Sequence, residues 1–111
     1  MIIQIFGKKS CNVTKKAERF FKERNIKFQF INIIEKVPSN KELQVITSTY
    51  PLEELLDVDG AEYKKRNLKY MVYDTEELLL ENPVLFKTPI IRKGSIVILG
   101  EDMEAWKELI K

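Results

Sequence analysis

The spacing of apolar residues changes twice in the first third of the chain. Residues 2–6 form a short β-branched run of the kind found in buried strands. From residue 12 the spacing becomes helical, which predicts an amphipathic helix that ends near Asn25. Residues 27–33 return to alternation and predict a second strand. The opening is therefore a β-α-β unit, whose two strands we expect to be parallel. The apolar positions of the helix are Val13, Ala17, Phe20 and Phe21.

The rest of the chain is first helical and then returns to strands. Residues 35–85 carry helix start and stop signals and short apolar repeats, without a repeat or low-complexity tract. Residues 90–91 and 96–99 are two apolar runs joined by a turn that contains Gly94, which predicts an antiparallel hairpin. Residues 101–111 predict a closing helix. The pattern predicts one α/β domain, residues 1–111, with a central four-stranded mixed sheet and a helical insertion at 35–85.

Composition narrows the possible chemistry. The chain has 111 residues, a formal net charge of +2, one cysteine and no histidine. The absence of histidine excludes Cys–His and Ser–His catalytic pairs, and one cysteine cannot form an internal disulfide or hold a structural zinc. We expect no metal site, no direct nucleic-acid binding and no membrane segment. The N-terminus lacks the basic region of a signal peptide, so we expect a cytoplasmic protein.

Three segments together resemble a known family. The stretches "FGKKSCNVTKKA" (6–17), "LLDVDGAEYKKRNL" (55–68) and "LLLENPVLFKTPIIRKG" (78–94) are similar, in this order, to the arsenate reductase (ArsC)-like family, which includes the Spx regulators. The resemblance covers almost the whole chain. It implies a thioredoxin-like fold in which Cys11 is the nucleophile and the Thr88-Pro89 bond is cis and lies beside it.

The sequence departs from that family at positions that matter for its chemistry. Where the family has arginines that hold the oxyanion, this chain has Thr88, Asp57 and a residue near Leu99. Without these arginines a bidentate anion clamp is missing, and Asp57 would repel arsenate, which argues against arsenate reduction. Where Spx-type proteins often have a second cysteine this chain has Thr14, which excludes an internal redox switch.

Cys11 is the main candidate for chemistry. At the start of a helix, the free backbone N–H groups from Asn12 onward and the helix dipole stabilise a thiolate. Thr14 has a hydroxyl that could donate to the sulfur, and Lys8 adds positive charge in the preceding loop. The alternative is a small apolar core residue, because free cysteines are among the most buried residue types. In that case the lysines are solvated charges without a specific role.

Thr88, Pro89 and Arg92 are the candidate substrate-binding residues. By resemblance, the backbone of the residue before the cis-proline pairs with the cysteine of a bound peptide such as glutathione. The alternative for Pro89 is a turn proline that starts an edge strand. Arg92 could serve as a displaced anion ligand, or be an exposed charge in the turn that follows. The aromatic residues expected in the core are Phe20, Phe21, Phe28, Phe30 and Trp106.

Three hypotheses follow. The first is an ArsC-like thiol oxidoreductase in which Cys11 acts on a thiol or disulfide-containing substrate, with glutathione, another low-molecular-weight thiol or a redoxin as the external thiol. The second is an Spx-like regulatory module that binds a protein such as RNA polymerase without catalysis. The third is arsenate reduction with an anion site rebuilt on Lys8 or Arg92.

Overall fold

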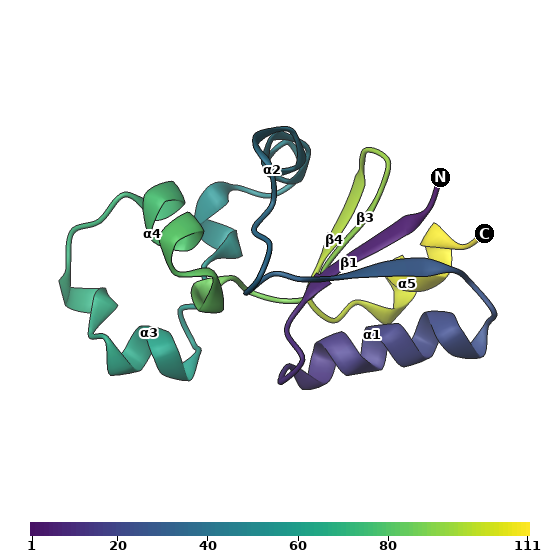
Figure 1. The fold of residues 1–111 in the computed structure, drawn as a ribbon, viewed down its shortest axis with the longest axis horizontal. Coiled ribbons are helices and arrows are strands. Elements are labelled where there is room, and N and C mark those ends of the chain that lie inside the picture. Colours follow the sequence, from purple (N-terminus) through teal and green to yellow (C-terminus); the bar gives the residue numbers. More distant parts are fainter.

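A computed structural model describes residues 1–111 and contains one four-stranded sheet (Figure 1). Its strands lie in the order β2-β1-β3-β4. The two strands of the opening unit, β1 and β2, are parallel, while β3 is antiparallel to both β1 and β4. The predicted mixed sheet and the order β-α-β, helical segment, β-β-α are therefore confirmed. The strand bounds are β1 Ile3–Gly7, β2 Phe28–Asn32, β3 Ile90–Lys93 and β4 Ile96–Leu99.

Helices α1 (Asn12–Glu23) and α5 (Met103–Leu109) cover one face of the sheet, below it in Figure 1. Phe20 and Phe21 of α1 pack against Trp106 of α5, with ring centroids 5.5 and 6.5 Å apart. All three side chains are buried, as the helical spacing predicts. Helix α1 ends at Glu23, and Asn25 then adopts a left-handed backbone with φ 57°, a conformation that asparagine tolerates well.

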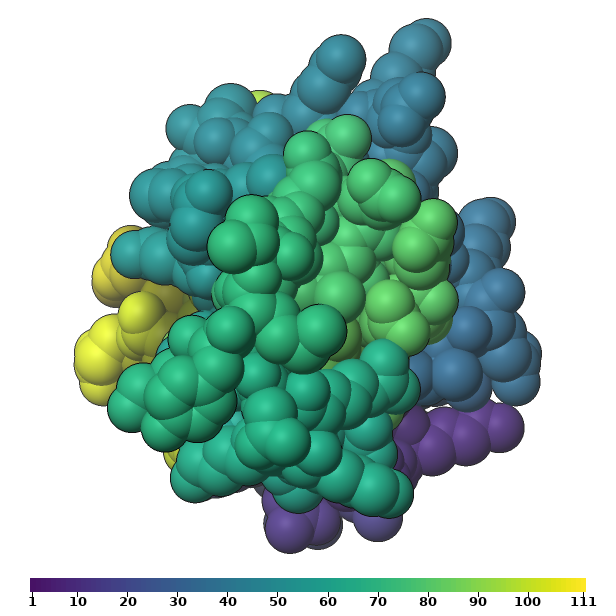
Figure 2. Space-filling model, turned by 90° about the vertical axis from the view of Figure 1, so that its left-hand side faces the viewer, coloured from purple at the N-terminus to yellow at the C-terminus, as the bar shows by residue number.

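The insertion supplies the other half of the core. Helix α2 (Asn40–Thr47) covers the second face of the sheet, and the following elements lie beyond the end at which β1 stops (Figure 1). In Figure 2 these elements face the viewer. Apolar residues of the insertion, such as Leu55 and Leu79, are buried together with Phe6 and Ile90 of the sheet. The remaining bounds are η1 Leu52–Leu55, α3 Ala61–Lys65, η2 Leu68–Tyr70, α4 Thr75–Glu81 and η3 Pro83–Leu85, where η denotes a 3-10 helix.

Local capping explains where two insertion helices begin. Ser39 and Glu42 form a reciprocal capping box at α2: the Ser39 hydroxyl accepts from the Glu42 N–H, and the Glu42 carboxylate accepts from the Ser39 N–H. The Asp74 carboxylate accepts from the Glu77 N–H at the start of α4. No helix of the chain is long and apolar enough to cross a membrane.

Two sequence-based expectations need correction. Phe28 and Phe30 are only half-buried, while Ile31 and Ile33 on the opposite side of the same segment are buried. The reason is that β2 is an edge strand, so its helix-facing side chains lie at the rim of the α1 layer. Arg92 is also not part of the turn: it lies within β3, pairs in register with Val97, and is half-buried.

Candidate functional site

Cys11 lies at the carboxyl end of the central strand β1, where a short loop leads into α1. It is the N-cap residue of that helix, with an extended backbone of φ −85° and ψ 117°. The loop is closed by a hydrogen bond of 3.0 Å from the Cys11 N–H to the Lys8 carbonyl. The side chain is partly exposed. The thiol is therefore accessible and lies beside the unpaired N–H groups of the first helical turn.

The segment before β3 approaches Cys11 from the other half of the sequence. The Thr88-Pro89 bond is cis, and Pro89 is buried at the start of β3. The Cys11 thiol donates to the Thr88 carbonyl over 3.7 Å, a contact between residues 77 positions apart. Because β3 is antiparallel to β1, its first residues lie at the strand end from which the Cys11 loop emerges.

Thr14 lies directly beneath this thiol, one turn into α1. Its side chain has no exposed surface, and its hydroxyl has no hydrogen-bond partner. It fits there because Gly7 has no side chain: a β-carbon at Gly7 would lie 2.3 Å from the Thr14 Cγ2 atom. A buried hydroxyl without a partner is costly, so a polar acceptor at Cys11 stabilises it.

The surroundings of Cys11 lower the pKa of its thiol. Burial alone raises the pKa and is the largest single influence. The side chains of Thr14 and Thr88 and the N–H groups of Thr14 and Val13 are placed to donate to the thiolate, and together they outweigh burial because each of them stabilises the charged form. The thiolate is the reactive form of cysteine, so this geometry favours a nucleophile.

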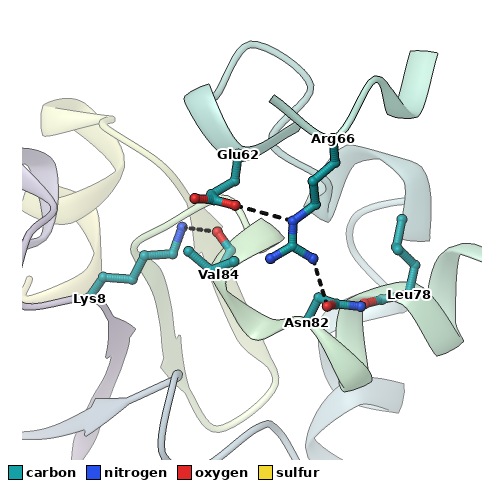
Figure 3. Close-up of polar contacts among 6 residues, drawn as sticks. All are labelled: Lys8, Glu62, Arg66, Leu78, Asn82 and Val84. Atoms are coloured by element: carbon teal, nitrogen blue, oxygen red, sulfur yellow. Dashed lines mark hydrogen bonds and ion pairs between the residues drawn. The ribbon is translucent and has the colours of Figure 1, made fainter. Parts of the chain in front are cut away.

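Lys8 joins the Cys11 loop to the insertion. Its ammonium group donates to the Val84 carbonyl over 2.8 Å and to the Phe86 carbonyl over 2.6 Å, and Figure 3 shows the first of these bonds. Desolvation lowers the Lys8 pKa, and the charges of Asp57 and Cys11 oppose that shift. Since both hydrogen-bond partners are backbone carbonyls just before Thr88, Lys8 fixes the segment that carries the cis-proline.

A second cation holds the insertion together on the far side of this segment (Figure 3). Arg66 follows α3; its Nε donates to Glu62 over 3.1 Å and its Nη1 to the Asn82 side-chain oxygen over 2.7 Å. The Asn82 amide in turn donates to the Leu78 carbonyl over 3.1 Å, across the end of α4. This network ties α3 to the turn that leads towards Thr88.

A small hollow of about 160 Å³ opens between the Cys11 loop and α3. Its charged lining consists of Lys8, Asp57 and Glu62, with Ser10 and Tyr63 beside them, and it contains no arginine. Lys8 is already bonded to carbonyls and Glu62 to Arg66. This hollow therefore has one cation, which is already hydrogen-bonded, and two carboxylates, and it lacks the bidentate donor that an arginine would offer to an oxyanion.

The structure brings together most, but not all, of the residues predicted from the sequence. Thr14, Thr88 and Pro89 surround Cys11, and Lys8 closes its loop. Asn12 is the exposed first residue of α1, and the N–H groups on the sulfur belong to the two residues after it. Arg92 pairs with Gln4 of β1, two residues before Phe6, and its side chain donates to the Gln4 side chain. The structure therefore does not bring Arg92 to Cys11.

Two parts of the site have no sequence signal of their own. The carbonyls of Val84 and Phe86 hold Lys8, but a backbone carbonyl exists at every residue and nothing marks these two. Gly7 reads as the start of a turn, and its close contact with Thr14 becomes visible only when strand and helix are packed. No group of three or more acidic, cysteine or histidine side chains is arranged to hold a metal ion.

A cysteine at the N-cap of the first helix, beside a cis-proline that opens the antiparallel hairpin, defines a thioredoxin-like protein. The chain belongs to the ArsC family, whose model matches residues 6–109.

Two regulators and one solved structure illustrate the similarity. The chain is 28% identical to the regulatory protein MgsR of Bacillus subtilis, over 82% of this chain and 76% of the relative. It is 30% identical to the global transcriptional regulator Spx 2 of Oceanobacillus iheyensis, over 82% of this chain and 70% of the relative. The structure of an ArsC family related protein from Bacteroides fragilis superposes with a TM-score of 0.82 at 25% identity, covering 98% of both chains.

Proposed function

We propose that this protein is a thiol oxidoreductase that works with a single cysteine and an external thiol. The observation that carries the proposal is the buried, unpartnered Thr14 hydroxyl beside the Cys11 sulfur. A thiolate sulfur accepts a hydrogen bond from a hydroxyl in that place far better than a neutral thiol sulfur, which is a weak acceptor. A cysteine that served only to fill space would not need it.

The reaction is a pair of thiol–disulfide exchanges. The Cys11 thiolate attacks one sulfur of a disulfide R–S–S–R′, so that a Cys11–S–S–R bond forms and R′–S⁻ leaves and takes up a proton. A second thiolate then attacks the mixed disulfide and releases Cys11 as thiolate. If the second thiolate is R″–S⁻, this attack forms R–S–S–R″, so the net result is that R′–SH is released, one external thiol is consumed and Cys11 is regenerated.

The chain's own residues position these steps. The N–H groups of Val13 and Thr14 and the hydroxyl of Thr14 stabilise the attacking and departing Cys11 thiolate. The backbone at Thr88 offers strand-like pairing to a bound thiol such as glutathione, another low-molecular-weight thiol, or the active-site segment of a redoxin. This cycle needs a compartment that keeps thiols reduced, so the proposal places the protein in the cytoplasm.

Thiolate titration and adduct analysis test the proposal in one sample. We expect the thiolate absorbance of Cys11 to appear with a midpoint below the ordinary value of about 8.5, and oxidised glutathione to give one mixed disulfide by mass spectrometry. The Cys11→Ser variant controls for tyrosine absorbance and for non-covalent binding. A midpoint at or above the ordinary value, together with no adduct, would contradict the proposal.

A second candidate is favoured by the comparisons, because MgsR and Spx 2 are both named as regulators. In this case the chain acts as a regulatory module, and by its resemblance to the Spx regulators its partner is RNA polymerase. Co-purification of polymerase with the wild-type protein and with Cys11→Ser separates the two candidates. Equal recovery and equal transcriptional effect support regulation without catalysis, whereas no recovery with either protein argues against it.

A further inference from the structure

A run of large apolar side chains on the insertion is unexplained by the fold. Tyr70, Met71 and Val72 are consecutive and have exposed fractions of 81%, 56% and 103%. Val58, in the loop before α3, is 47% exposed. Packing in the core accounts for none of these residues. Contiguous exposed apolar positions in a folded domain mark an interaction site more often than a structural need.

Val58 and Tyr70 line a hollow of about 530 Å³ on the insertion, and Met71 and Val72 follow Tyr70 directly in the chain. Val58, Tyr63 and Tyr70 form its apolar lining. Its shape is held by specific contacts: Asn67 ends the α3 segment in a left-handed conformation with φ 53°, and the buried Leu68 then anchors η2. The hydroxyls of Tyr63 and Tyr73 lie 3.5 Å apart and connect α3 to the segment that follows residue 72.

The charge around this hollow is positive. Lys64 and Lys69 line it and form no ion pair, and the Lys69 ammonium lies 5.9 Å from the Tyr70 ring centroid. Asp59 is the one carboxylate in the lining. The neighbouring Arg66 is bonded to Glu62 and Asn82, so it stabilises the insertion instead. Two free ammonium groups beside an apolar hollow are complementary to carboxylates that flank an apolar anchor.

We propose that Val58, Lys64 and residues 69–72, named here the insertion surface, dock an acidic segment of a partner protein that carries a large apolar side chain. The apolar side chain enters the hollow against Val58 and Tyr70, and the acidic groups pair with Lys64 and Lys69. Figure 2 shows the insertion occupying the face turned to the viewer. Docking on this surface does not itself require reaction at Cys11.

The insertion surface also adjoins the thiol site. Tyr63 lines both the 530 Å³ hollow and the 160 Å³ hollow that contains Lys8 and Ser10. A partner segment docked on one side of Tyr63 therefore lies next to the loop that holds Cys11. If the protein is a regulator, this surface binds its partner. If it is an oxidoreductase, the same surface brings a cysteine of the partner protein close to Cys11.

Selection from a library of random twelve-residue peptides against the immobilised full-length protein tests the proposal. We expect the enriched peptides to combine Asp or Glu with Leu, Phe or Trp. Synthetic copies should bind at least tenfold more weakly to Lys64→Glu/Lys69→Glu and to Tyr70→Ser/Met71→Ser. The matched control is Lys36→Glu/Lys41→Glu, which changes the charge equally at exposed lysines of the insertion outside this surface. All changed residues are exposed, and circular dichroism verifies that the variants fold.

Three outcomes would overturn the proposal. In the first, the selection enriches no peptide on the wild-type protein relative to the Tyr70→Ser/Met71→Ser protein. In the second, the enriched peptides carry no acidic residues. In the third, the peptides bind the Lys64→Glu/Lys69→Glu protein as tightly as the control protein. Sedimentation that shows a dimer abolished by the same variants would also overturn it, because a second copy would then be the occupant. Reaction of Cys11 with oxidised glutathione, measured on each variant, reports on the thiol proposal separately and should stay unchanged.

Discussion

Gly7 and Thr14 share one small space at the junction of β1 and α1: a β-carbon on Gly7 would meet the Thr14 Cγ2 atom at 2.3 Å and its hydroxyl oxygen at 2.8 Å. The glycine lets the helix approach the strand closely enough for the Thr14 hydroxyl to face the Cys11 sulfur. The geometry of the thiol site therefore depends on the lack of a side chain at Gly7, four residues before Cys11.

Gly7→Ala is expected to destabilise the protein by about 1–3 kcal/mol, the usual cost of overpacking a filled interior. The new methyl group has to displace Thr14, so the Cys11 pKa should rise in the same variant. Chemical denaturation measures the first effect and thiolate absorbance the second.

Thr14→Ala provides the internal control for that substitution. It removes the Thr14 Cγ2 and hydroxyl oxygen, the two atoms closest to a methyl group at residue 7, and leaves the β-carbon of residue 14 at 3.1 Å from that methyl group. The double variant should therefore lose about 1 kcal/mol less than the sum of the single losses. Strict additivity would show that the two side chains do not compete for the same space.

Thr14→Val keeps the shape of the side chain and removes the hydroxyl. We expect the Cys11 pKa to rise, because the Thr14 hydroxyl is one of the groups that stabilise the thiolate. Thr14→Ser, which retains the hydroxyl, should stay near the wild-type value. An unchanged midpoint in Thr14→Val would mean that the hydroxyl does not contact the thiolate.

The stability of the protein should follow the same titration. Folding lowers the Cys11 pKa relative to the unfolded chain, so the thiolate's contribution is complete above the unfolded pKa and is lost as the pH falls through the folded pKa. The unfolding free energy of Thr14→Val should rise less over this window than that of the wild type. Below the window, where Cys11 is neutral, the valine should cost little, because a neutral thiol is only a weak acceptor for the threonine hydroxyl.

The fold could be predicted from the sequence because its signals are local. Strand β1 and helix α1 follow from the spacing of apolar residues within each segment, and the Ser39–Glu42 capping box is a pattern only four residues long. Alternation along β2 could not show that Phe28 and Phe30 are half-buried, since it carries no information on whether a strand lies at the edge of a sheet. The place of Arg92 inside β3 has no local signal for a similar reason, because its cross-strand partner Val97 lies beyond the turn.

The candidate site was predictable only in part. Cys11, Thr14 and Pro89 are marked by the resemblance and by their places at element ends. The role of Lys8 was not, because its two bonds span 76 and 78 positions and end on backbone atoms. In the sequence, a lysine near a cysteine suggests that it attracts an anion. Only the folded structure shows that the Lys8 ammonium is already hydrogen-bonded to two backbone carbonyls.

Lys8→Met should destabilise the protein by about 2 kcal/mol. The methionine preserves the apolar stem but leaves the Val84 and Phe86 carbonyls without their charged donor, and each lost bond of this kind costs about 1–3 kcal/mol before partial rehydration. Lys9→Met is the matched control, because Lys9 is the exposed neighbour in the same loop. Equal unfolding midpoints in urea for the two variants would contradict a bridging role for Lys8.

Arg66→Ala should loosen the connection between α3 and α4. The substitution removes the bonds to Glu62 and Asn82, and because Arg66 is largely exposed we expect a loss of only about 1 kcal/mol. Hydrogen exchange should accelerate in residues 75–85 while β1 and α1 keep their protection. Lys65→Ala, which removes an adjacent exposed cation with no ion pair, should leave exchange at these residues unchanged.

The thiol site is assembled from the two ends of the chain. Cys11 touches Thr88, and Gln4 of the central strand is bonded to Arg92, 88 positions later. During synthesis from the N-terminus, Cys11 leaves the ribosome long before either of these partners has been made. A nascent chain therefore carries Cys11 without its Thr88 contact on an incomplete sheet, and the complete thiol site exists only once the C-terminal hairpin has been translated and docked.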